Sequence, residues 1–408
     1  MGICASLWNT AGFLGGLFVL DGRMALRGRK VAIGVLFSAS GPYAAIGAEG
    51  LAGTILAIDE INASGQHDFV LEAQVRDPQG ATENYAALAA DIVATSGARH
   101  IIGCTTSWSR KEVIPLLEKS NTMLWYPCPY EGFEAHEQVI YLGACPNQHV
   151  LPLLEFALPR FGADGYLVGS NYIWGWETSR IARDAMEAAG GRVAGERYVP
   201  LGDVDVDRII EEIRLKRPSF ILNTLIGPSS YAFLKAYAEL GRADSSFQAA
   251  LRPVLSCNFS EPELAQVGAA AEGQIAVSPY FQNLATEENQ QFLGVVARLA
   301  PETEHVSAFF AQAYAAVHLL AAGLSATGTD DTKTVLGAVA GRAVSAPFGP
   351  MEIERSNNHA VLTPRIARAT SAGFEIVADQ CVAIRPDPYL AHVATRSAPH
   401  ASHLRVVK

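Results

Sequence analysis

Hydrophobic and polar positions alternate between two periods along most of the chain. The apolar, Val- and Ile-rich run KVAIGVLFS at 30–38 is typical of a buried strand, and LAGTILAIDEIN at 51–62 has helical spacing. The same change recurs in FVLEAQVRD, ATENYAALAADIVATSG, RHIIGC and SRKEVIPLLEKSN, and in the last of these Ser109 and Glu112 have the spacing of a capping box. Strands that alternate with helices predict parallel sheets covered on both faces.

The pattern contains about ten such strand–helix units, which is too many for one comfortable open sheet. It therefore predicts an α/β protein with two doubly wound parallel-sheet lobes. Two long helices are expected near 286–327. Short alternating strands with turn signals at 356–358 and 371–373 complete the pattern.

The segment LWYPCPYEGFE at 124–134 departs from this alternation. Pro127 and Pro129 lack an N–H group and fix φ, which argues against a helix interior or a central strand. The segment is therefore expected to be a rigid loop with aromatic walls. Such a loop suits either catalysis at Cys128 or the binding of a small molecule.

Hydroxyl, amide and aromatic residues follow the predicted strands. In doubly wound sheets, ligands bind beyond the carboxyl ends of the strands. These places hold TTSWS after RHIIGC, Asn171 and Tyr172 after DGYLVGS, a Pro-Ser-Ser run after SFILNTLIG, and Asn258 and Phe259 after PVLSC. They nearly lack charge, so two facing lobes would form a cleft suited to a neutral polar molecule.

Composition narrows the classes of function. A hydrophobic fraction of 49% and a charged fraction of 18% fit a well-packed globular protein. The net charge of -10 argues against a nucleic-acid or anionic-membrane surface. The six cysteines form no C-x-x-C pair and no Cys/His metal spacing, so neither a disulfide framework nor a metal is expected, and a reducing compartment is favoured.

Residues 1–28 are predicted to be an N-terminal extension. The first twenty residues carry no charge, and the basic residues follow this apolar stretch instead of preceding it, unlike those of a secretory signal. Three interpretations stay open: translation that begins at Met24, a poor export signal, or an ordered extension.

Several longer sequence motifs indicate a resemblance to a known family, and this resemblance covers about residues 29–390. The motifs are GCTTSWSRKEVIPLLEK, PYEGFE at 129–134, ACPNQ at 144–148, GSNYIW at 169–174 and IRPDPY at 384–389. In these motifs the chain resembles the type I periplasmic-binding-protein superfamily. Within it, the chain is most similar to the urea and short-chain amide receptors, above all the amide-sensing negative regulators of aliphatic amidase operons.

The resemblance implies a chain that crosses between the lobes three times, near 145–148, 276–282 and 346–350. Lobe one would then comprise residues 29–146 plus 281–347 and lobe two residues 147–280 plus 348–390, with a C-terminal tail at 391–408. The implied ligand contacts are Ser107, Tyr126, Cys128, Pro129, Tyr172 and Thr224.

Three positions depart from the pattern of the amide regulators. Thr105 and Trp174 stand where those proteins have tyrosines, and Cys128 stands where they have a threonine. The pocket, to which Thr105 also belongs, is therefore expected to be larger or to carry different hydrogen-bond donors.

The resemblance implies a non-catalytic receptor without a cofactor that closes two lobes around a small amide or urea. As a cytoplasmic sensor it would control amidase expression by sequestering an RNA-binding transcription antiterminator. The alternative is the periplasmic receptor of an ABC-type urea or amide importer, with a permease as its partner. A homo-oligomer is left open.

A hydrolase with Cys128 as nucleophile is the competing hypothesis. It is disfavoured because the loop offers no nearby His or Lys to activate the thiol, and its prolines remove backbone N–H donors. Glu131 and Glu134 are predicted to be helix-starting or solvated residues and not an acid–base pair.

Overall fold

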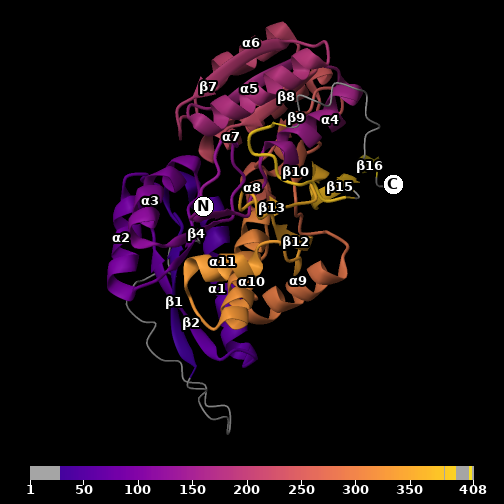
Figure 1. The fold of residues 1–408 in the computed structure, drawn as a ribbon. Coiled ribbons are helices and arrows are strands. Elements are labelled where there is room, and N and C mark those ends of the chain that lie inside the picture. The colour runs from indigo at the N-terminus through magenta and orange to yellow at the C-terminus, as the bar shows by residue number, and fades with distance from the viewer. Residues whose placement is uncertain (1–27, 381, 392–403, 407–408) are drawn as a thin grey trace.

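The computed structural model describes residues 28–380, 382–391 and 404–406. The chain forms two lobes, each built around its own sheet (Figure 1). The predicted α/β architecture with parallel sheets in two lobes is confirmed. The stretch for which three interpretations were open and most of the C-terminal tail lie outside the described residues.

The first lobe contains a five-stranded sheet in the order β2-β1-β3-β4-β5, and all its neighbouring strands are parallel. Its central strands are buried on both faces, which is why they consist of continuous apolar runs. The strands are β1 Arg29–Leu36, β2 Phe69–Arg76, β3 His100–Gly103, β4 Met123–Tyr126 and β5 Val139–Tyr141, and the helices between them are α1 Ala44–Ser64, α2 Asn84–Ser96 and α3 Ser107–Ser120.

The second lobe contains an eight-stranded sheet in the order β16-β15-β14-β10-β9-β8-β6-β7. The five strands that come first in the chain are parallel to one another. Strands β14, β15 and β16 extend the sheet beyond β10, and each of them is antiparallel to its neighbour. The strands are β6 Gly165–Ser170, β7 Val193–Val199, β8 Phe220–Thr224, β9 Val254–Ser256, β10 Ile275–Ser278, β14 Arg365–Thr370, β15 Gly373–Gln380 and β16 Leu404–Val406. The helices are α4 Val150–Phe161, α5 Ile173–Ala188, α6 Asp207–Lys216, α7 Pro228–Ala243 and α8 Glu261–Val267.

After β10 the chain returns to the first lobe. It forms α9 Glu287–Leu299, α10 Ala308–Thr327 and α11 Thr332–Val339, followed by a small antiparallel sheet of β11 Val344–Ala346, β12 Gly349–Ile353 and β13 Ala360–Val361. Met351 and Leu362 are buried in the same core as α1 and α10. The change of sheet therefore follows Leu362, later in the chain than the crossing predicted near 346–350.

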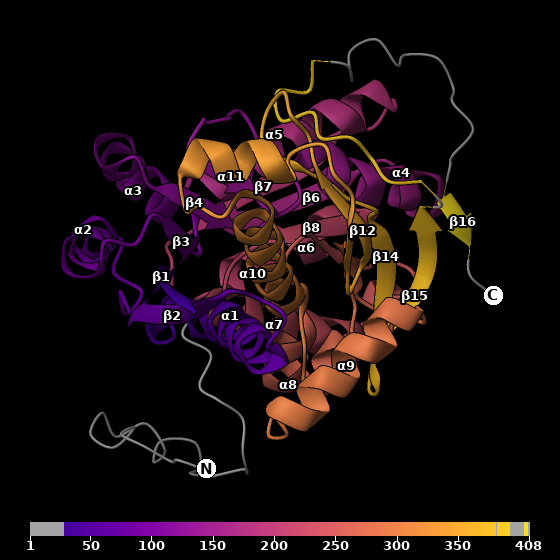
Figure 2. The ribbon, with the colours of Figure 1, turned by 60° about the horizontal axis from the view of Figure 1, so that its bottom comes forward.

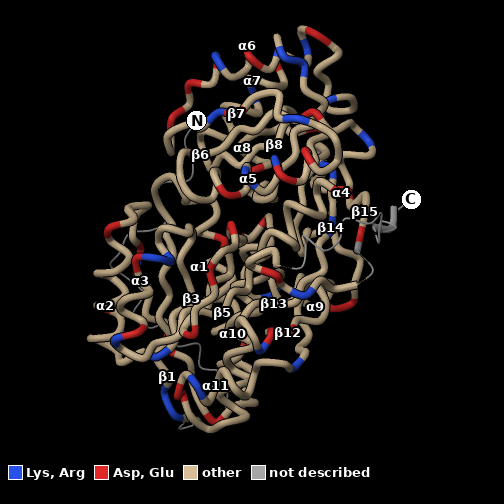
Figure 3. The backbone as a smooth tube through the Cα atoms, turned by 45° about the horizontal axis from the view of Figure 1, so that its top comes forward, with Lys and Arg blue, Asp and Glu red and all other residues tan. Residues whose placement is uncertain are grey.

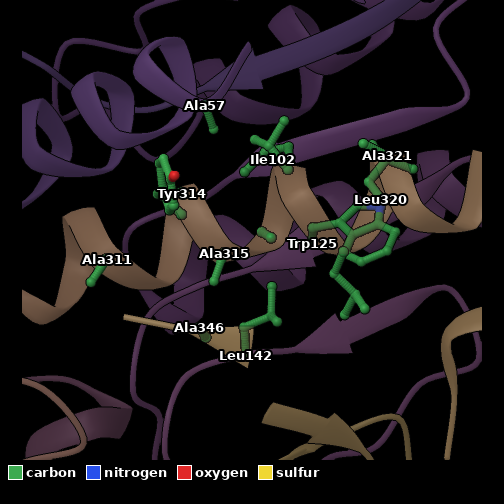
Figure 4. Packing of buried hydrophobic residues seen from close by; sticks show 14 of the residues in the cluster. Ala57, Ile102, Trp125, Leu142, Ala311, Tyr314, Ala315, Leu320, Ala321 and Ala346 are labelled. Atoms are coloured by element: carbon green, nitrogen blue, oxygen red, sulfur yellow. The ribbon is translucent and has the colours of Figure 1, made fainter. Parts of the chain in front are cut away.

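Helix α10 forms the centre of the first lobe. It lies beside α1 and α11 (Figure 2), and its residues Leu320 and Ala321 lie in one apolar cluster with Trp125 of β4 (Figure 4). Among the described residues it is the one helix long and apolar enough to cross a membrane, but 83% of its most apolar window is buried inside the protein. Its hydrophobicity is that of a core helix.

Two local predictions differ from the structure. Trp125 and Tyr126 belong to the central strand β4, so the irregular loop begins only at Pro127. Helix α3 begins two residues before Ser109 because Thr106 is extended and caps it: the Thr106 hydroxyl accepts from the Ser109 N–H at 3.1 Å, and the Ser109 hydroxyl accepts from the Thr106 N–H at 3.0 Å.

The close approach of α1 to α10 generates a stability prediction. A Cβ atom on Gly53 would lie 2.3 Å from the Phe310 carbonyl oxygen, whereas one on the exposed helical Gly294 would meet nothing within 4 Å. Gly53→Ala is expected to lower the free energy of unfolding by about 1–3 kcal/mol because the two helices must separate. Gly294→Ala, the control, is expected to raise it by about 0.4–1 kcal/mol. Denaturant unfolding of both variants measures this, and equal effects would contradict the packing described.

Candidate functional site

Six of the seven predicted ligand-binding residues are buried where strands end. Thr105 and Ser107 follow β3, Tyr126 ends β4, and Cys128 lies two residues further along. In the second lobe, Tyr172 follows β6 and Thr224 ends β8, whereas Pro129 of the first lobe is half-buried. The carboxyl ends of parallel strands in both lobes therefore supply these residues, as expected for a doubly wound fold.

The turn after β3 sets the position of the predicted ligand-binding residues that follow this strand. Cys104 has a φ of 65°, a conformation that non-glycine residues rarely adopt, and its N–H donates to the Leu36 carbonyl at 2.8 Å. This sharp turn directs the chain from the strand into α3. Ser107 therefore stands on the first turn of a helix whose N-terminus points at the edge of the sheet.

The structure brings Tyr172 of the second lobe to the residues of the first. Trp108 packs on Tyr172 with ring centroids 5.2 Å apart. Burial holds the pKa of the Tyr172 phenol well above its ordinary value, and neighbouring Tyr126, Glu131 and Cys128 raise it further. These groups converge between the lobes.

Close contacts between residues of the two lobes hold the lobes together. The Arg180 guanidinium lies over the Phe133 ring, 4.8 Å from its centroid, and joins α5 to the loop after β4. At Gly227 φ is +58°, and an added Cβ would lie 2.5 Å from the Pro42 carbonyl oxygen of the other lobe. Only glycine fits so near to the backbone of the other lobe. Because the two lobes approach each other this closely, the described conformation is a closed one.

Thr224 and Thr105 are held within their own lobes. The Thr224 hydroxyl donates to the Val168 carbonyl at 3.3 Å inside the second sheet. The Thr105 hydroxyl accepts from Tyr85 at 3.5 Å, and the Tyr85 hydroxyl also lies 2.7 Å from that of Ser38. Their role as ligand contacts stays a prediction.

Cys128 lacks the features of a nucleophile. Its thiol donates to the Cys104 carbonyl, with sulfur and oxygen 3.6 Å apart. Burial, with a smaller contribution from Cys104, raises the pKa of this thiol above its ordinary value, whereas a catalytic cysteine needs a lowered pKa. The thiol therefore stays protonated at neutral pH.

The sequence did not predict a role for Arg110, and the two glutamates were misjudged from it. Arg110 is fully buried, its Nε lies 2.6 Å from Glu134 Oε1, and its guanidinium lies 4.7 Å from the centroids of both the Tyr126 and Tyr130 rings. Glu131 is 1% exposed and accepts from the Ser107 hydroxyl through Oε2. The predictions of a nearly uncharged site and of a helix-starting or solvated glutamate pair are therefore wrong.

The charges in this cluster support one another. Burial disfavours the charged form of Arg110, but Tyr126, Glu131 and Glu134 together raise its pKa well above the ordinary value. Burial likewise opposes ionisation of Glu134, but Arg110 and Lys111 lower its pKa to about 2. Both groups are therefore ionised at neutral pH. Helical spacing could have indicated that Arg110 belongs to the site, because this residue lies one turn after Ser107 and shares its face of α3.

Several buried polar atoms have no hydrogen-bond partner among the described residues, and three of them belong to segments that face the other lobe. These three are the Tyr126 hydroxyl, Glu131 Oε1 and Trp174 Nε1. A buried polar group without a partner costs about 1–3 kcal/mol. One acceptor and two donors are thus available to a molecule that enters the cleft.

A small cavity is lined by residues of both lobes, and Pro129 is the one predicted ligand contact among its lining residues. Pro129, Ala144 and Gln312 line it from the first lobe, and His149, Asn258 and Ser278 are among its lining residues from the second. Its volume of about 20 Å³ is room for about one water molecule. This cavity is therefore too small for a solute larger than water in the described conformation.

The geometry defines a class of protein, a binding protein with two lobes that close over a buried polar site. The chain belongs to the periplasmic binding protein family: the family described as periplasmic binding protein domain matches residues 31–395. This agrees with the resemblance to the type I superfamily.

Several relatives are similar over most of their length. A Leu/Ile/Val-binding protein homolog 6 of Brucella abortus (strain 2308) is 25% identical over 334 residues, which cover 81% of this chain and 85% of that protein. Two solved structures share the fold. A solute binding protein of an ABC transporter from Rhodopseudomonas palustris HaA2, in complex with p-hydroxybenzoic acid, has a TM-score of 0.77 and 21% identity, with 85% and 95% of the chains covered. The leucine binding protein LivK from Thermotoga maritima has a TM-score of 0.74 and 18% identity, with 87% and 99% covered.

Acidic side chains buried near the lobe interface predict a pH effect. Glu261 and Glu263 begin α8, burial raises the pKa of each to about 8, and nearby Glu49 raises that of Glu261 further. The folded protein keeps these protons up to about pH 8, whereas the unfolded chain loses them near the ordinary carboxyl pKa. The folded state therefore binds more protons than the unfolded state, and stability falls as the pH rises.

The prediction applies between about pH 6.5 and 8. Below this range His100 and His149, whose pKa values burial lowers to about 4, give the opposite slope. Melting temperatures are expected to fall from pH 6.5 to 8, and to fall less steeply in Glu261→Gln. Glu239→Gln, at an exposed glutamate, is the control and should retain the wild-type slope. An unchanged slope in Glu261→Gln would contradict the assignment.

Proposed function

We propose that the protein is the solute receptor of an ABC-type importer and that it closes its lobes around a small amide or urea. The observation that carries this proposal is that buried polar atoms without a hydrogen-bond partner in the described residues, those of Tyr126, Glu131 and Trp174, lie on segments of the two lobes that face each other. The similarity to solute binding proteins of ABC transporters supports the receptor role. Lys and Arg alternate with Asp and Glu over both lobes (Figure 3), a surface that does not suggest nucleic-acid binding.

The binding energy available to a small amide sets a requirement on the site. At a ceiling of about -1.5 kcal/mol per non-hydrogen atom, a four-atom amide gains at most about -6 kcal/mol, which corresponds to a dissociation constant of tens of micromolar. Such a ligand needs a site that is nearly preformed. Strand ends, prolines and packed tyrosines provide that rigidity.

The sensor hypothesis rests on the resemblance to amide regulators alone. It requires a cytoplasmic protein and an RNA-binding antiterminator as partner, whereas an importer requires export and a permease. Family membership favours the importer, so we infer a periplasmic location. The predicted ligand contacts, Thr105 and Thr224 included, form part of this proposal.

Location separates the two functions directly. N-terminal sequencing of the native protein after cell fractionation is expected to give a processed chain in the periplasmic fraction, because a receptor for an importer acts outside the inner membrane. An unprocessed chain confined to the cytoplasm, recovered together with an RNA-binding protein, would favour the sensor instead.

Tyr126 tests the site. Tyr126→Phe removes a buried hydroxyl that has no partner in the described part of the chain, so the free energy of unfolding is expected to rise by about 1 kcal/mol. If this hydroxyl donates to the ligand, affinity for acetamide falls about fivefold to tenfold. Thermal melting and isothermal titration calorimetry measure the two effects.

Tyr237→Phe is the matched control. The Tyr237 hydroxyl donates to the Arg252 carbonyl at 2.7 Å within the second lobe. Its removal is expected to cost about 1 kcal/mol of stability and to leave binding unchanged. A Tyr126→Phe variant that binds acetamide as tightly as the wild type would count against the proposed site.

A further inference from the structure

Glu131 is a buried carboxylate with one oxygen that has no hydrogen-bond partner among the described residues. Oε2 accepts from the Ser107 hydroxyl, which fixes the carboxylate in the loop after β4. Oε1 lies 3.6 Å from Arg110 Nη2, which is close enough for an ion pair and too far for a hydrogen bond. One carboxylate oxygen is thus held in place, buried, and able to accept.

The cation beside Glu131 is already engaged. Arg110 donates through Nε and Nη2 to Glu134, at 2.6 Å and 3.3 Å. Glu134 also pairs with Lys111, so the two cations and the two carboxylates of the cluster sum to zero. A ligand with a carboxylate would add an uncompensated negative charge beside Glu131, which is costly at a buried position.

The surrounding donors complete the pattern. The Tyr126 hydroxyl and the Trp174 indole N–H are among the other buried polar atoms that lack hydrogen-bond partners within the described residues. Tyr126 lies on the Arg110 guanidinium, and Trp174 begins α5 on the opposite lobe. A carbonyl oxygen can accept from such donors while an N–H of the same molecule donates to Glu131 Oε1.

We propose that Glu131 determines the specificity of the cleft: its free oxygen accepts an N–H of the ligand, so the site takes amides and urea and rejects carboxylates of the same shape. This proposal rests on the proposed function, because it assumes that the interlobe cleft is where the solute binds. It adds a selecting residue and a rule for the ligand class.

Acetamide and acetate form the discriminating pair, because they have the same number of non-hydrogen atoms and differ in an amino group against an anionic oxygen. Calorimetric titration of the wild type is expected to give acetamide at least tenfold higher affinity than acetate. Glu131→Gln keeps the shape and removes the charge, so acetamide affinity is expected to fall about tenfold and the preference over acetate to shrink to a few-fold.

Glu137→Gln is the matched control. It removes an exposed carboxylate from the same loop, and Glu137 takes no part in the ion pairs of Arg110 and Lys111 with Glu131 and Glu134. Its melting temperature and its preference for acetamide over acetate are expected to stay those of the wild type. Near- and far-ultraviolet circular dichroism shows whether each variant is folded, and the wild-type comparison needs no variant.

The outcomes separate the two proposals. Wild-type protein that binds neither acetamide nor urea would overturn the proposed ligand and this inference together. Binding of acetamide with an equal affinity for acetate, or an unaltered preference in Glu131→Gln, would overturn the role of Glu131 and leave the receptor function standing.

Discussion

The buried guanidinium of Arg110 is the interaction on which the site depends. It joins α3, the Tyr126 and Tyr130 rings and both carboxylates of the following loop. A buried charge is tolerated only when it is paired and hydrogen-bonded, and removing one partner of such a cluster typically costs about 3–5 kcal/mol. The cluster therefore fixes the loop that carries the site, and the position of Glu131 follows from a requirement of the fold as much as from a requirement of binding.

This arrangement would let a charged cluster serve the neutral ligand that we propose. Two cations and two carboxylates balance within the first lobe, so the cleft carries no net charge from them. The ion pairs differ in quality, because Glu134 receives close hydrogen bonds and Glu131 a looser contact with Arg110. Because of this difference, one oxygen of Glu131 stays free to accept a hydrogen bond. Its position is fixed by the packed loop that carries it, unlike that of a flexible side chain on the surface. The tyrosine rings exclude water and strengthen each of these interactions.

The period of the hydrophobic pattern predicted the alternating architecture because it reports burial on both faces of parallel strands. The same rule located Ser107 and Tyr172 at strand ends. It could not find Glu131 and Arg110, because a charged residue in one sequence carries no sign of whether a partner awaits it 20 residues away. Composition favoured solvated glutamates, and only tertiary pairing overrules that expectation. Strand β4 was hidden for a different reason: Pro127 excludes a ladder hydrogen bond at its own position, but it leaves the residues before it free to join the sheet.

The unpartnered atoms also bear on how so small a solute can move two lobes. Closure without a ligand buries the Tyr126 hydroxyl and Glu131 Oε1 away from any hydrogen-bond partner among the described residues, at about 1–3 kcal/mol for each group. In an open conformation water satisfies both atoms. A ligand that supplies an N–H and a carbonyl oxygen removes this cost only in the closed state, so its affinity differs between the two states, and that difference alone shifts the equilibrium. Unsatisfied polar groups thus reduce the stability of the empty closed state and make closure depend on the solute.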